Sequence, residues 1–148
     1  MADEQAPQKY IGVKIVEAWP QTGPPKDASP SAPGYAVRYS DGYVSWSPKD
    51  VFEAAYFPMT DSSGATVSVS MVDAMSANVE SRQIDDKTTL AIATCLTRFK
   101  MYETSSCVDP ENFDQAVGKK IATERIRGRL WELLGFVVSW GRFGLQKK

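Results

Sequence analysis

Histidine is missing from this 148-residue sequence, and only two cysteines occur, Cys95 and Cys107. Without an imidazole there is no standard general base at neutral pH and no Ser–His or Cys–His nucleophile pair, and most zinc and iron ligand sets are excluded. The sequence also has no phosphate loop, no dinucleotide-binding glycine pattern and no carboxylate cluster at metal-ligand spacing. We therefore expect a binding protein without a cofactor. Catalysis by carboxylates or lysine alone is disfavoured but stays open.

Long apolar segments are lacking as well. No run approaches the ~20 residues that a membrane-spanning helix needs. A signal peptide begins with a basic segment followed by an apolar one, whereas residues 1–8 are polar. We expect the protein to remain in the compartment where it is made, away from membranes. In a reducing cytosol the two cysteines should be free thiols.

Charge is distributed unevenly along the chain. The net charge is −1, yet residues 119–148 carry eight Lys or Arg and two Asp or Glu, whereas residues 1–118 carry nine and sixteen. This asymmetry suggests an anionic partner for the basic end or docking of that end on an acidic surface. On charge alone, solvated basic side chains are the simpler explanation. Because the whole chain is acidic and its basic region short, nucleic-acid binding is disfavoured.

The first part of the chain predicts a β-hairpin-plus-helix module over residues 9–59, after a disordered tail at 1–8. The hairpin is indicated by two apolar runs around Asp41-Gly42, where glycine supplies the positive φ of a tight turn. Ser47-Pro48 is typical of a helix start. The predicted elements are a strand at 9–19, a proline-rich loop at 20–33, a hairpin at 35–46 and a helix ending before residue 58.

The second part predicts a domain at residues 67–148, joined through a linker at 60–66. Its long helix is expected at 111–134, with Gly135 as its cap and an apolar ridge of Phe113, Val117, Ile121, Ile126, Leu130, Leu133 and Leu134. The other predicted elements are a helix at 70–80, strands at 88–97 and 99–107, and a closing strand or tail at 136–140. The fold class is α+β, with the long helix packed on a small antiparallel sheet. Such a layer leaves apolar surface uncovered, so we expect a dimer.

A second stripe of the long helix contains candidate binding residues. Gly118, Ala122, Arg125 and Arg129 follow one another at spacings of four, three and four, so they share one face. Two guanidinium groups one turn apart suit phosphate oxygens. Two interpretations stay open: a phosphate site, or a helix–helix contact through the small residues with the arginines solvated or ion-paired.

Phe99 is a candidate for stacking on a nucleobase. It lies between Arg98 and Lys100 at a predicted hairpin turn, and an aromatic plane flanked by positive charge suits a base. The alternative is an ordinary inward-facing strand residue.

Three segments resemble a known group of proteins: CVDPENFD at residues 107–114, GKKIA at 118–122 and LWELLGF at 130–136. They are similar to the gene 49 / gene 66 family of small bacteriophage proteins, and the resemblance covers residues 67–148. One departure is Thr97-Arg98, because family members usually have Asn-Gly at that turn. The first module is also similar to a segment of many small phage and prophage proteins. A phage origin implies the host bacterial cytoplasm as the location.

The C-terminal part also resembles the first class of Thoeris anti-defence proteins. These are phage-encoded sponges that sequester cyclic ADP-ribose-type signals, and in some members cyclic oligonucleotides, without cleaving them. The resemblance implies a dimer or hexamer in which Phe99 stacks on the base and Arg125 and Arg129 bind phosphates, while Asp109 or Asn112 contacts a sugar or base edge.

Arg127 is kept as a reserve phosphate ligand, because the match along the helix is uncertain by one position. The competing hypothesis is a protein–protein adaptor or inhibitor, whose aromatic first module holds a host or phage protein and whose dimer seam is Gly118 and Ala122. The two hypotheses differ in geometry: Arg125 and Arg129 should converge in a pocket in a sponge and diverge into solvent in an adaptor.

Overall fold

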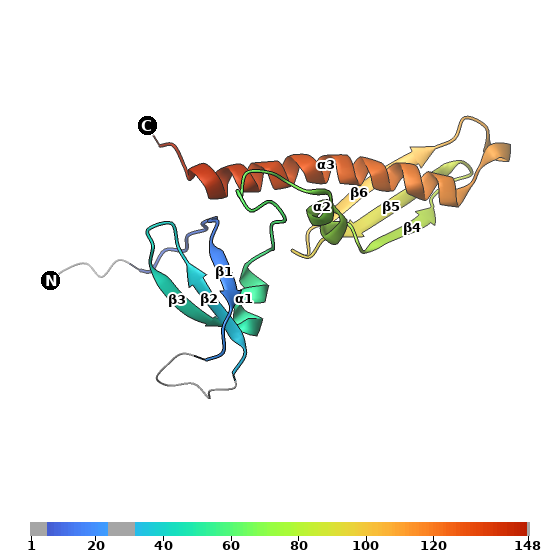
Figure 1. Ribbon diagram of the computed structural model, residues 1–148. Coiled ribbons are helices and arrows are strands. Elements are labelled where there is room, and N and C mark those ends of the chain that lie inside the picture. The colour runs from blue at the N-terminus through green and yellow to red at the C-terminus, as the bar shows by residue number, and fades with distance from the viewer. Residues whose placement is uncertain (1–5, 24–31, 148) are drawn as a thin grey trace. The chain divides into compact units, whose positions relative to one another are not determined.

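The computed structural model describes residues 6–23 and 32–147, and the chain divides into two compact units. The first unit is Met1–Ala55 with Ser139–Lys148, and the second is Tyr56–Val138. Each contains a three-stranded antiparallel sheet and helical segments (Figure 1). The predicted α+β class is therefore confirmed. Most of the predicted tail at 1–8 and part of the predicted loop at 20–33 lie outside the described residues.

The first unit forms a sheet in the order β1-β2-β3, followed by a short helix. The predicted hairpin is confirmed, and Gly42 has the expected positive φ of 88° in its turn. Tyr35 on β2 stacks on Phe52 of the helix with ring centroids 4.4 Å apart, which attaches the helix to the sheet. The elements are β1 Glu17–Pro20, β2 Gly34–Arg38, β3 Val44–Pro48 and α1 Lys49–Ala55.

Two predicted boundaries in this unit are wrong. The strand expected at 9–19 begins only at Glu17. Ahead of it, side-chain carbons of Val13 and Ile15 lie 3.4 and 3.1 Å from where a Cβ on Gly141 would stand, so this apolar alternation serves packing. The helix begins after Pro48 because β3 continues to that residue, where it pairs with Gly34 of β2.

The second unit forms a sheet in the order β4-β5-β6, with α2 and the long helix α3 packed against it. The strands predicted at 88–97 and 99–107 are confirmed as β5 and β6. β4 was not predicted. The helix expected at 70–80 stops at Met75, where Ser76 leaves the helical conformation (φ −105°) and its N–H and hydroxyl both donate to the Val72 carbonyl. The elements are α2 Val69–Met75, β4 Val79–Gln83, β5 Thr88–Thr94, β6 Lys100–Ser106, a 3₁₀ turn Pro110–Asn112 and α3 Gln115–Phe143.

α3 starts later and runs further than the sequence predicts. The Asp114 carboxylate accepts from the N–H groups of Ala116 and Val117 and so caps the first turn. Gly135 lies inside the helix rather than at its end, and the strand or tail expected at 136–140 is helical. The chain leaves the helical conformation at Gly144, whose φ is +65°.

The buried face of α3 confirms the predicted ridge at Ile126, Leu130 and Leu134 but differs from it in the first turns. Val117 and Ile121 are 53% and 42% exposed. Gly118 packs against Thr89 of β5 instead, so closely that a Cβ at this position would lie 2.8 Å from the Thr89 Cβ. The small residues therefore mark the face that approaches the sheet. The buried positions recur every four residues: Gly118, Ala122, Ile126, Leu130, Leu134 and Val138.

The segment between residues 60 and 66 folds into a turn around Asp61. The carboxylate of Asp61 accepts hydrogen bonds from the hydroxyl and N–H of Ser63 and from the hydroxyl of Thr66. These bonds favour the charged form and hold the pKa of Asp61 well below its usual range.

Candidate functional site

Arg125 and Arg129 lie side by side along the outer edge of β6. Arg125 Nη1 donates to the Thr104 carbonyl at 2.5 Å, and Arg129 Nη1 lies 3.4 Å from the Tyr102 carbonyl oxygen. Cys95 N donates to the Phe99 carbonyl, so the alternation of an antiparallel ladder turns the carbonyls of residues 102 and 104 away from β5. The two guanidinium groups thus cover the free edge of the sheet, which limits edge-to-edge pairing.

Arg129 is also paired with an acid. Its Nη1 lies 3.2 Å from Glu103 Oε1, and the side chains of Arg129 and Glu103 are 49% and 26% exposed. Sequence reasoning missed Glu103, because the pairing depends on how α3 lies across β6. A sponge should have the two guanidinium groups converging in a pocket, and an adaptor should have them diverging into solvent. They do neither among the described residues, because both lie on the edge of β6 and line no described cavity.

Phe99 and Arg98 lie at the turn between β5 and β6. Phe99 precedes β6 and is 58% exposed, so it is not buried as an ordinary inward-facing strand residue would be. Phe99, Met101 and Glu103 alternate along the strand and share one face. Met101 is buried in the core with α3, so this is the face toward the helix. We call Phe99, Glu103, Arg125 and Arg129 the β6 strip.

The remaining candidates, Asp109 and Asn112, follow the opposite end of β6. The Asp109 carboxylate accepts from the Glu111 N–H and caps the 3₁₀ turn. Phe99 and Cys107 are separated by eight residues of extended chain, about 26 Å at the usual rise per residue. One chain therefore does not bring Asp109 or Asn112 to Phe99.

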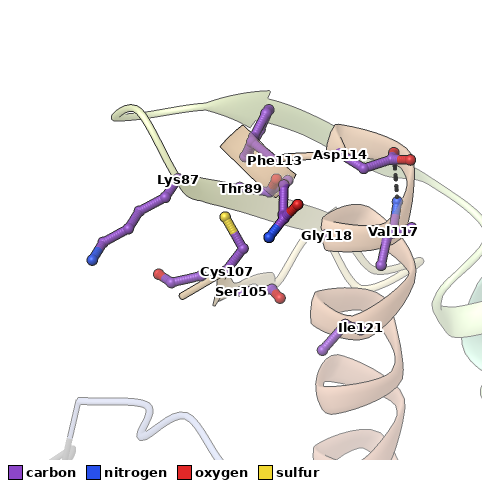
Figure 2. Close-up of a pocket in the computed structure, with 11 residues that line it drawn as sticks. Lys87, Thr89, Ser105, Cys107, Phe113, Asp114, Val117, Gly118 and Ile121 are labelled. Atoms are coloured by element: carbon purple, nitrogen blue, oxygen red, sulfur yellow. Dashed lines mark hydrogen bonds between the residues drawn. The ribbon is translucent and has the colours of Figure 1, made fainter. Parts of the chain in front are cut away.

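Asn112 instead lines a separate cavity of about 310 Å³ in the second unit (Figure 2). Thr89 and Ser105, which pair across β5 and β6, are buried and contribute hydroxyl groups. Thr89 Oγ1 has no hydrogen-bond partner among the described residues. Figure 2 shows the Lys87 side chain extending away from Gly118. The cavity is lined by Lys87, Thr89, Ser105, Ser106, Cys107, Asn112, Phe113, Asp114, Val117, Gly118 and Ile121, so it contains no arginine.

Arg127, the reserve candidate, has a structural role. Its Nη1 lies 2.6 Å from the Asp73 carboxylate and 3.3 Å from the Ser76 hydroxyl, and its side chain is only 21% exposed. Arg127 therefore ties α3 to the end of α2. It lies apart from the arginine pair on β6, which leaves Arg125 and Arg129 as the phosphate candidates.

The first unit has a shallow hollow of its own beside the β2–β3 turn. Lys14 Nζ lies 4.6 Å from the centroid of the Tyr39 ring, and Tyr39 and Tyr43 stack with centroids 6.0 Å apart. The hollow is lined by Lys14, Tyr39, Ser40, Asp41, Tyr43 and Ser45. Tyr43 is 64% exposed, so this unit presents an aromatic surface.

Both cysteines are free thiols, as predicted. Burial raises the pKa of the Cys95 thiol, which keeps it protonated and unreactive. Within residues 6–23 and 32–147, no three Cys, Asp or Glu side chains gather into a group that could hold a metal ion. No helix in this described part combines the length and apolar character of a membrane span.

Comparison with known proteins identifies a family. Neither the curated proteins nor the solved structures contain a match to this chain. A family model, Phage protein (N4 Gp49/phage Sf6 gene 66) family, matches residues 49–140, from the start of α1 into the last turns of α3. The match covers more than half of the sequence and confirms the family that the three sequence segments suggest. The chain therefore belongs to the N4 Gp49/phage Sf6 gene 66 family of phage proteins.

Proposed function

We propose that this phage protein is an anti-defence sponge, which binds a cyclic ADP-ribose-type or cyclic nucleotide signal in the host cytoplasm and does not cleave it. The observation that carries the proposal is the placement of two guanidinium groups, one helical turn apart, on one edge of β6, the strand that the exposed Phe99 precedes. Capture needs no general base or nucleophile, and the chain has no histidine to supply one.

The β6 strip has the donors and the dimensions for a nucleotide. Each guanidinium carries five N–H donors, and the carbonyl bonds described above use few of them. Planar forks of this kind bind phosphate oxygens in pairs. Phe99 precedes Tyr102 by three residues, about 10 Å along a strand. A base stacked on Phe99 would therefore place its phosphates within reach of Arg129.

A second copy of the chain would bring together site residues that lie far apart within one chain. Asp109 and Asn112 lie beyond the far end of β6, so we propose that a homodimer brings these residues of one copy to the β6 strip of the other. The exposed Val117 and Ile121 on α3 supply apolar surface for such an assembly. A hexamer would be built from such dimers.

Calorimetric titration with cyclic ADP-ribose isomers and cyclic di- and trinucleotides tests the proposal. We expect one ligand to bind the natural protein tightly and to bind Arg125→Ala/Arg129→Ala at least about 100-fold more weakly, because charge-assisted bonds to both guanidinium groups are lost. Lys119→Ala/Lys120→Ala removes the same charge from the same helix and should retain the affinity. Absence of heat with every ligand, or equal weakening in the control, would contradict the proposal.

The adaptor hypothesis stays as a second candidate because of the aromatic surface around Tyr39 and Tyr43. Tyrosine is enriched among the residues that dominate protein–protein binding, and Tyr43 is exposed here beside the half-buried Tyr39. If the adaptor hypothesis holds, a tagged natural protein should retain one specific host or phage protein in a pull-down, and Tyr43→Ala should lose it while Arg125→Ala/Arg129→Ala keeps it. Retention of that protein by Tyr43→Ala would count against this surface.

A further inference from the structure

We propose that Glu103 is the internal counterion of the β6 strip and sets the minimum charge a ligand must carry to be captured. The inference rests on the proposed function, because it concerns the same arginines. It begins from the asymmetry between them: Arg129 is paired with Glu103 at 3.2 Å, whereas the bond that the structure gives Arg125 goes to a neutral carbonyl.

Glu103 is held in place by the strand. It belongs to β6, on the same face as Met101, which is buried to 1% exposure under α3. The Glu103 side chain is only 26% exposed, about half as much as that of its partner Arg129. A carboxylate in this position is already ordered beside the guanidinium and does not have to be recruited from solvent.

This arrangement divides the strip into an open half and an occupied half. A ligand with one phosphate can approach Arg125, but it meets the negative charge of Glu103 and gains little from Arg129. A ligand with two neighbouring phosphates can bind Arg125 with one group and displace the carboxylate from Arg129 with the other, because phosphate carries more charge and more acceptor oxygens. Glu103 therefore weakens the binding of every anion to the strip, and only a ligand whose second phosphate outcompetes the carboxylate gains Arg129.

The other charged neighbours do not take over this role. Arg127 is paired with Asp73 and Glu124, so those acids are already engaged away from the strip. When Glu103 is displaced, Arg129 still has the Tyr102 carbonyl beside it at 3.4 Å, which keeps the guanidinium oriented along β6. Displacement of Glu103 thus frees N–H donors without releasing the arginine.

Calorimetric titration of Glu103→Gln with inorganic pyrophosphate and orthophosphate tests the inference. Removing the carboxylate should tighten pyrophosphate binding about five-fold, as expected for loss of one competing surface ion pair. Orthophosphate, which leaves the carboxylate in place, should gain less, so the preference for pyrophosphate over orthophosphate should rise. Glu80→Gln, which makes the same change on β4 at the opposite edge of the sheet, should leave both affinities unchanged.

The outcomes separate this inference from the proposed function. Binding to the natural protein with the same preference in Glu103→Gln, or weaker binding in that variant, overturns the role of Glu103 alone. Absence of pyrophosphate binding, together with absence of binding of every cyclic nucleotide tested, overturns both. Glu103→Asp keeps the charge but withdraws the carboxylate from Arg129, so an intermediate preference is expected. It replaces Glu103→Gln if the neutral variant does not fold.

Discussion

Arg98 adopts a backbone conformation that side chains with a Cβ rarely take. Its φ is +69° at the turn between β5 and β6, where its N–H donates to the Cys95 carbonyl. Because glycine adopts positive φ without a steric cost, we expect Arg98→Gly to raise the free energy of unfolding by about 1 kcal/mol. Denaturant titration beside Arg98→Ala, which removes the charge but keeps the Cβ, checks this. Equal shifts in both variants would refute the backbone explanation.

The sequence indicated which individual side chains belong to the candidate site, but not that they lie close together. The spacing of Arg125 and Arg129 placed them on one side of a helix, and the flanking charges singled out Phe99. Their common location on β6 was not predictable, because it depends on the register of α3 against the sheet. The same register brings Glu103 to Arg129 and leaves Asp109 and Asn112 elsewhere.

The elements of the fold were predicted unevenly for a physical reason. The β2–β3 hairpin was recognised from Gly42, a local signal that needs no tertiary information. The face of α3 was predicted correctly at Ile126, Leu130 and Leu134 but misjudged in its first turns, because the large apolar residues there were taken as the core side. The structure buries Gly118 and Ala122 there instead, since Thr89 of β5 comes close to the helix backbone. Propensity and periodicity do not reveal such a close approach.

The two glycines of α3 provide a matched test of this packing. At Gly118 a Cβ would lie 2.8 Å from the Thr89 Cβ, whereas at Gly128 it would meet nothing within 4 Å. We expect Gly118→Ala to lower the free energy of unfolding by about 1–3 kcal/mol through overpacking. Gly128→Ala should raise it by roughly 1 kcal/mol because alanine favours the helix. Chemical denaturation measures both, and a shift of the two variants in the same direction would contradict the assigned face.

For the chain as a whole, the family and the fold class followed from the sequence, whereas its assembly and ligand remain proposals. The match to residues 49–140 begins at α1, ahead of the segments that first suggested the family. Residues 139–148, at the end of α3 and beyond, belong to the first unit, together with Val13 and Ile15, which approach Gly141. Such contacts between distant parts of the chain escape local sequence patterns, and so does any site shared between two copies.

Depletion of a signal from solution, followed by its recovery, distinguishes capture from every other activity. An excess of the protein is incubated with the cyclic ADP-ribose isomer or cyclic nucleotide that binds in the titration. The free ligand is filtered off and quantified by mass spectrometry. The protein is then denatured by heat to release the bound ligand. We expect the natural protein to remove the ligand in proportion to its sites and to return it intact, and Arg125→Ala/Arg129→Ala to leave it in solution. Ligand that stays free with the natural protein, or returns cleaved, would contradict sequestration.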